Sequence, residues 1–152
     1  MSMCCSCGCA TRVFLAEVEL WRGRFGTATA MGALCIARLI VAWLPFKWWG
    51  GSLGAASADD AKAQASARKI ARQVDRAAAR LPFPTKCLPR AMGLSWLLRR
   101  QAIGHSVVIA VRPLEWRSSA DSLHAWVEID GAKVMGDLPG PWLETLRLEG
   151  RK

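Results

Sequence analysis

A stretch near the C-terminal end of the chain has the pattern of a β-hairpin. Apolar and polar side chains alternate on both sides of Asp130-Gly131, a dipeptide that strongly favours a two-residue turn between antiparallel strands. Counting outward from that turn places His124 directly opposite Asp137, on one shared face. The same register pairs the opposite charges of Glu128 and Lys133. A slip of one residue would mix the apolar and ionisable faces, so the pattern favours this register.

The apolar residues of the remaining chain recur mostly at helical spacing. Residues 88–100 are apolar nearly all round, which predicts a buried helix with Pro89 in its first turn. Residues 106–112 are apolar on both faces and predict a central strand. The other expected elements are helices at residues 10–24, 27–45, 57–81 and 142–148, with a linker at residues 50–58.

Residues 27–49 are rich in apolar side chains but contain Arg38 near the middle and Pro45 toward the end. A helix that spans a bilayer needs about 20 consecutive, largely uncharged residues, so this segment falls short of that requirement. It predicts instead an amphipathic or buried helix that ends at Pro45. Core packing, dimerisation and peripheral membrane contact are its alternative roles, in that order.

The chain has 152 residues, which suits one domain, and a formal charge of +9 from 21 basic and 12 acidic residues. Such a balance favours an acidic partner or an anionic surface. The arginines and the lysine between residues 68 and 80 are spread along one predicted helix, as on a solvated face. Because no helix-turn-helix, zinc-finger or RNA-binding motif accompanies them, we expect no nucleic-acid partner.

Four of the six cysteines crowd into residues 4–9, at a spacing that fits neither a disulfide framework nor a common zinc site. We expect no metal. The N-terminal stretch has no pattern of basic head, apolar stretch and small-residue cleavage site, which predicts a cytoplasmic protein. No P-loop, dinucleotide fingerprint or serine nucleophile elbow occurs in the sequence, so we expect no cofactor.

Cys87 lies where a helix N-terminus would activate a thiol, between the proline-rich residues 81–86 and the predicted helix that follows. Unpaired N–H groups and the positive end of the helix dipole favour the thiolate there and could form part of an oxyanion hole. A neutral His124 could take the thiol proton, and Asp137 could hold the imidazole. Each residue alone fits a structural role, whereas their combination predicts a catalytic triad.

Three ordered motifs carry a family resemblance: KCLPRAMGLSWLLRR at residues 86–100, VVIAVR at residues 107–112 and HAWVEIDG at residues 124–131. Over residues 72–139 the chain resembles the transglutaminase-like cysteine proteases that remove the leader from lasso-peptide precursors in bacteria. The resemblance implies that Cys87, His124 and Asp137 form a Cys-His-Asp triad.

The last member of this triad departs from the family pattern. The acid often follows the histidine one residue sooner, and Gly136 occupies that position here. The hairpin register favours Asp137, while Asp130 and Asp121 stay open as alternatives.

The resemblance also implies an α+β fold with a papain- or transglutaminase-like core. In it a buried helix bearing the cysteine packs against a small antiparallel sheet, and N-terminal helices precede this core. We expect a tail and helical extension at residues 1–56 and the protease domain at residues 57–152. The implied partners are the precursor peptide, a separate leader-binding protein and the lasso cyclase.

Two other functions stay open. A papain-like acyl transferase or amidase with another substrate would use the same triad, because all such reactions pass through an acyl-enzyme. A non-catalytic adaptor could instead bind an acidic peptide or a membrane through its basic helices, with the three triad residues serving only in packing.

Overall fold

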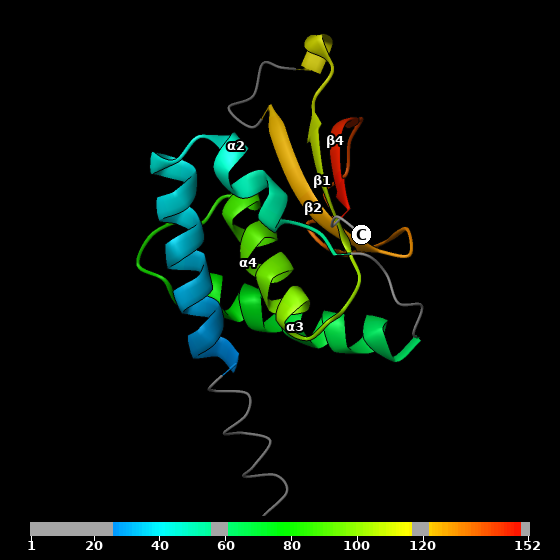
Figure 1. Ribbon diagram of the computed structural model, residues 1–152. Helices are drawn as coiled ribbons and strands as arrows, with labels where there is room; N and C mark the ends of the chain where they lie inside the picture. Colours follow the sequence, from blue (N-terminus) through cyan, green and yellow to red (C-terminus); the bar gives the residue numbers. More distant parts are fainter. Residues whose placement is uncertain (1–25, 56–60, 117–121, 150–152) are drawn as a thin grey trace, which may run out of the picture.

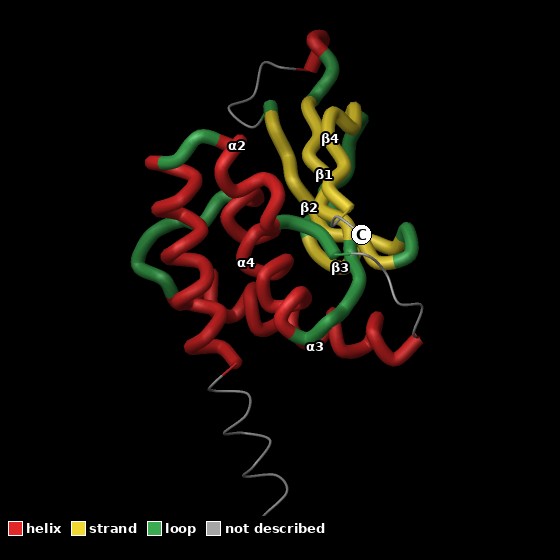
Figure 2. The backbone as a smooth tube through the Cα atoms, viewed as in Figure 1, coloured by secondary structure: helices red, strands yellow, loops and turns green. Residues whose placement is uncertain are grey.

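The computed structural model describes residues 26–55, 61–116 and 122–149. In this part of the chain, helices cover one face of a four-stranded antiparallel sheet (Figures 1 and 2). The α+β architecture expected from the sequence is therefore confirmed. The expected helix at residues 10–24, the cysteine cluster at residues 4–9 and Asp121 lie outside the described residues.

The helical elements follow the apolar pattern closely. The first helix of the described part of the chain ends at Trp43, just before Pro45, as expected from a residue that cannot continue the helical hydrogen bonds. The chain then enters one further short helix that the sequence did not predict. In chain order the helices of the described residues are residues 26–43, α2 (Phe46–Trp49), α3 (Ala61–Arg80) and α4 (Cys87–Arg100), with short 3₁₀ turns at Gly50–Ser52 and Leu114–Trp116.

Helix α4 is the centre of the core, between the 26–43 helix and the sheet (Figure 1). A Cβ atom at Gly93 would lie 3.3 Å from Leu34 Cδ2, so glycine allows the 26–43 helix to approach α4 closely. Fully buried side chains from both helices, from α3 and from the sheet form one cluster. It includes Leu34, Val74, Leu94, Val107 and Val127. The division at residue 56 stays a prediction, and the 26–43 helix shares this core with the downstream elements.

The sheet consists of the strands β1 (Ser106–Val111), β2 (Leu123–Ile129), β3 (Ala132–Met135) and β4 (Leu143–Glu149). Their order in the sheet is β3-β2-β1-β4. The inner position of β1 agrees with its expected central place, since its residues 107–110 are all buried. The helix-facing side carries Ile109, Ala125 and Val127, whereas Val108 and Trp126 pack on the outer side.

The expected C-terminal helix at residues 142–148 is wrong, because this segment is strand β4. It pairs antiparallel with β1 from Ser106↔Glu149 to Val111↔Leu143. Leu148 packs on the core, while most of the strand is exposed. The edge of β1 offers unpaired N–H and C=O groups, and pairing with them outweighs the weak helical preference of a short, exposed segment.

The β2–β3 hairpin confirms the expected turn and part of the expected register. Asp130 and Gly131 have φ values of 50° and 75°, as a type I′ turn requires, and Glu128 pairs with Lys133. Beyond this pair the register shifts by one residue, so that Val127 faces Met135. The expected pairing of His124 with Asp137 is therefore wrong. A β-bulge at Val134 adds one residue to β3 and changes every pair farther from the turn.

The second histidine of the chain, His105, is a structural residue. Its side chain is 4% exposed, its Nδ1 lies 2.9 Å from the carbonyl oxygen of Ile103, and its Nε2 lies 2.7 Å from Ser95 Oγ. Since a carbonyl only accepts, Nδ1 carries the hydrogen and Nε2 accepts from the Ser95 hydroxyl. Ser95 Oγ in turn accepts from the backbone N–H of Gly54 at 3.1 Å. The cluster ties the segment before α3 to the end of α4.

Burial lowers the pKa of His105 below its usual value of 6.5, with a further lowering by Arg99 and a partly opposing hydrogen bond to Ile103. The unfolded chain therefore binds a proton that the folded chain excludes, and stability present above pH 6.5 is lost as the pH falls toward the lowered pKa. We expect His105→Gln to reduce this pH dependence in urea unfolding curves at neutral and mildly acidic pH. His124→Gln is the matched control, and an unchanged dependence in His105→Gln would contradict the assignment.

Candidate active site

Cys87 is the first residue of α4, and the extended Lys86 precedes it with φ −70° and ψ 168°. The N–H groups of a first helical turn have no intrahelical partner, and they point toward the region in front of the helix. The Cys87 thiol is free and half-buried, and its Sγ lies 3.7 Å from the carbonyl oxygen of Leu123. The nucleophile expected from the sequence therefore lies at the helix start and against the first residue of β2.

His124 follows as the second residue of β2, and its ring is held by a backbone group. Nε2 lies 2.7 Å from the carbonyl oxygen of Gly136. Because that oxygen can only accept, Nε2 carries the hydrogen and Nδ1 is the basic nitrogen of the neutral ring. Gly136 has a φ of 84°, and a Cβ atom there would come within 3.0 Å of the Ala125 carbonyl oxygen. Glycine thus lets this carbonyl reach the imidazole.

Two tryptophans fix the plane of the imidazole. The ring centroid of His124 lies 5.0 Å from that of Trp142 and 5.9 Å from that of Trp126. The guanidinium of Arg112 covers Trp142, with Cζ 4.7 Å from the ring centroid. The succession of Arg112, Trp142 and His124 restricts the orientation of the imidazole.

Cys87 and His124 line two neighbouring cavities together. One cavity of about 460 Å³ is lined by charged side chains, and we call it the charged cavity; these are Asp75, Arg90, Lys133 and Asp137. The other, of about 690 Å³, is lined mainly by apolar side chains, and we call it the apolar cavity; they include Val41, Leu88, Leu123, Leu138 and Trp142. The thiol and the imidazole therefore stand where the two cavities meet. No group of metal-ligating side chains occurs in the described part of the chain.

Asp137 lines the charged cavity with His124, but its carboxylate contacts another residue. Oδ1 lies 3.2 Å from Lys133 Nζ, and the side chain is 80% exposed. Within the described residues, the hydrogen bond of the His124 ring goes to Gly136 instead. The catalytic role of Asp137 stays a prediction. Asp130 occupies the turn beyond the other end of β2, roughly 20 Å from His124 at the rise of an extended strand, which is too far for contact.

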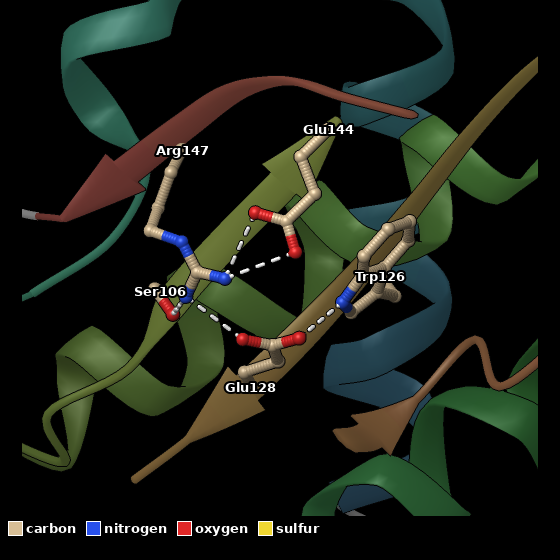
Figure 3. Close-up of polar contacts among 5 residues, drawn as sticks. All are labelled: Ser106, Trp126, Glu128, Glu144 and Arg147. Carbon is tan, nitrogen blue, oxygen red and sulfur yellow. Dashed lines mark hydrogen bonds and ion pairs between the residues drawn. The ribbon is translucent and has the colours of Figure 1, made fainter. Parts of the chain in front are cut away.

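A polar network on the outer face of the sheet supports Trp126 (Figure 3). The buried carboxylate of Glu128 accepts from Trp126 Nε1 at 2.6 Å and from Arg147 Nη1 at 2.8 Å. Hydrogen bonds from Arg147 raise the pKa of its guanidinium, the one to Glu128 more than those to Glu144. A buried carboxylate without such partners would be strongly destabilising. The network therefore holds one of the two rings that pack on His124.

The sequence did not predict this network. The expected partner of Glu128 was Lys133, which does face it across the strands, but Lys133 Nζ lies over the Trp126 ring at 4.9 Å and pairs with Asp137. The two-residue spacing of Trp126 and Glu128 places both side chains on one face of a strand, and it could have indicated their contact. Arg147 was not recognisable as their partner, because its segment was expected to be helical.

Comparison with known protein families adds one finding. Residues 31–145 match the family model described as the transglutaminase-like superfamily. Comparison with the curated proteins and with the solved structures gives no significant match. The match covers most of the chain and includes Cys87, His124 and both cavities beside them. The chain therefore belongs to the transglutaminase-like superfamily, a group that generally includes papain-like cysteine proteases and acyltransferases.

Proposed function

We propose that this protein is a cysteine peptidase that removes the leader from a ribosomally made lasso-peptide precursor. One observation carries the enzymatic part: Cys87 at a helix start and His124 with a basic Nδ1 line the same two cavities. The three sequence motifs that resemble lasso-peptide leader peptidases support the choice of substrate.

In the proposed reaction, His124 Nδ1 takes the proton of the Cys87 thiol, and Sγ attacks the carbonyl carbon of the scissile peptide bond. The C=O bond becomes a C–O⁻ bond in the tetrahedral intermediate, and N–H groups of the first turn of α4 stabilise that oxyanion. The intermediate collapses as the C–N bond breaks. His124 returns its proton to the leaving amine, which is the new N-terminus of the core peptide.

The leader then remains on Cys87 as a thioester. A water molecule gives a proton to His124 Nδ1 and attacks the thioester carbon, the C–S bond breaks, and the thiolate takes the proton back. The products are a leader with a free carboxylate and a core peptide with a free amine. In the proposed pathway this amine is what the cyclase joins to an acidic side chain.

The arrangement of the cavities agrees with a peptide substrate. A chain that crosses the site from one cavity to the other presents its scissile bond where thiol and imidazole meet. We propose that the chain works in the cytoplasm without a cofactor. A separate leader-binding protein presents the precursor, and no nucleic acid takes part.

Mass spectrometry of a precursor incubated with the protein and its leader-binding partner tests this proposal. We expect two fragments whose masses sum to that of the precursor plus one water. Transfer of the acyl group to an added amine, with no hydrolysis, would favour the acyltransferase instead. An unchanged precursor together with ordinary alkylation kinetics at Cys87 across pH would favour the non-catalytic adaptor.

Asp137→Asn is expected to slow cleavage by only about tenfold. In triads whose carboxylate fixes the imidazole tautomer, the same change costs about 10⁴-fold. Here the Gly136 carbonyl fixes the tautomer, so the variant loses only one negative charge from the lining of the charged cavity. Single-turnover cleavage rates measure the loss, with Asp130→Asn as the control that keeps a turn-compatible residue. A loss of about 10³-fold or more would show that Asp137 bonds His124 during catalysis.

A further inference from the structure

An exposed apolar corner joins the 26–43 helix to α2, on the opposite side of the helix from the core. Residues 42–48 are all exposed, with Trp43 at 82% and Trp48 at 73%. Soluble domains rarely expose several large apolar side chains side by side without a partner. We call this surface the tryptophan corner, and it consists of Ile36, Leu39, Trp43, Leu44, Phe46 and Trp48.

The tryptophan corner has a fixed shape, because a buried residue anchors it. Trp49 is 7% exposed, and its Nε1 donates to the Leu44 carbonyl oxygen at 3.1 Å. Its ring meets that of Phe46 edge to face, at a centroid distance of 4.8 Å. The backbone N–H of Trp48 donates to the carbonyl oxygen of Pro45 at 3.0 Å. The exposed rings thus project from an ordered scaffold.

The charged side chains of the segment that carries the tryptophan corner have one sign. Between residues 26 and 55 the only charged side chains are Arg38 and Lys47, and the whole chain carries +9. Lys47 is exposed between the aromatic residues. Exposed indoles beside a lysine suit the boundary between lipid headgroups and acyl chains, where the rings enter the apolar layer and the ammonium stays with phosphate.

Contrary to the expectation from the sequence, the 26–43 helix is long and apolar enough to cross a membrane, by length and composition alone. Its other face, however, packs into the core through Ala30, Leu34 and Ala37, which have no exposed surface. Insertion across a bilayer would break the packing of these residues against α3 and α4. A surface position leaves the core intact and covers only the side chains that are already exposed.

A bilayer suits this surface better than a protein partner does. The corner projects outward, and a protein would need a matched hollow for each ring, whereas a bilayer accepts rings of any arrangement. Lysine is also depleted at protein interfaces but favoured beside anionic lipid. We propose that the tryptophan corner docks this protein on the surface of an anionic phospholipid bilayer. Since Val41 and Ala42 of the same helix line the apolar cavity, docking would hold the mouth of that cavity close to the membrane.

Vesicle sedimentation with the full chain tests this proposal, using phosphatidylcholine with and without phosphatidylglycerol. We expect binding to the anionic vesicles that weakens with salt. The double variant Trp43→Ala/Trp48→Ala should lower the partition coefficient at least about tenfold, since two large apolar side chains are removed. Lys47→Glu should lower it about tenfold on anionic vesicles only. Leu114→Ala, at a position 79% exposed outside the corner, is the matched control and should bind normally.

A second measurement guards against misfolding of the alanine variant. Brominated lipids should quench the fluorescence of the wild-type protein but quench that of Trp43→Phe/Trp48→Phe far less, because this variant lacks the two indoles that enter the lipid. The phenylalanines preserve a ring at each position, so the fold of the corner is kept. The proposal would be overturned if the wild-type protein did not bind anionic vesicles. A dimer, seen by analytical ultracentrifugation, that the double variant abolishes while vesicle binding persists would also overturn it. Peptide cleavage without vesicles should be the same in all these variants, so failure of docking is distinguishable from failure of the peptidase assignment.

Discussion

Cys87→Ala is expected to abolish precursor cleavage, with a loss of at least about 10⁴-fold in the single-turnover rate. The variant lacks the sulfur atom that forms the thioester, and no other group at the start of α4 can replace it. Its stability should change by less than about 1 kcal/mol, because the side chain is half-buried and makes one weak hydrogen bond. Thermal unfolding and intact-mass measurement of the products together check both statements.

Cys35→Ala is the matched control for this variant. Cys35 is also a free, half-buried thiol, but it lies on the 26–43 helix and lines neither cavity. Its variant should cleave the precursor at the normal rate. Full activity in Cys87→Ala would contradict the assignment of Cys87 as the nucleophile, as would loss of activity in a folded Cys35→Ala protein.

His124→Ala is expected to be about as inactive as Cys87→Ala, a loss of about 10⁴-fold or more. Without the imidazole, no group takes the thiol proton or returns it to the leaving amine. The double variant should be little worse than either single variant, because residues that act as one unit have non-additive effects. Independent losses that multiply would instead identify His124 as a residue that only packs against Trp126 and Trp142.

A conservative change separates the chemistry of His124 from its packing. His124→Gln keeps a planar polar group beside the two tryptophans but has no titratable nitrogen, so its rate should be as low as that of His124→Ala. His105→Gln should by contrast lower stability, since His105 lies in the Ser95 cluster, without lowering the rate of the folded protein. A fully active His124→Gln protein would contradict the role of Nδ1 as the base.

The elements that carry the nucleophile and the base could be predicted because local signals agree with the fold. Pro89 and the apolar run around it predict a helix from Leu88, directly beside Cys87, and α4 begins one residue earlier, at Cys87 itself. Asp130-Gly131 fixes the turn of the hairpin that carries His124. In both regions the backbone preference of a few neighbouring residues decides the structure, so the sequence alone is informative.

The remaining features depend on contacts between distant parts of the chain. Strand β4 forms because β1 has an open edge, and the sequence of residues 143–149 contains no information about that edge. The role of Arg147 follows only once β4 is a strand. The Gly136 carbonyl could not be predicted as the partner of His124, because a shift of one residue along β3 decides which group meets the ring. Local pattern does not determine such a shift.

The β-bulge in β3 absorbs one extra residue between His124 and Asp137. Continuing the shifted register by two residues places Asp137 opposite Ala125, where residue 136 would lie in a hairpin without the bulge. A gap-free alignment with an unbulged relative would therefore match its acid to Gly136, whereas a one-residue gap at Val134 would match it to Asp137. Length variation by a single residue in this hairpin can thus leave the spatial position of the acid unchanged while displacing it in sequence.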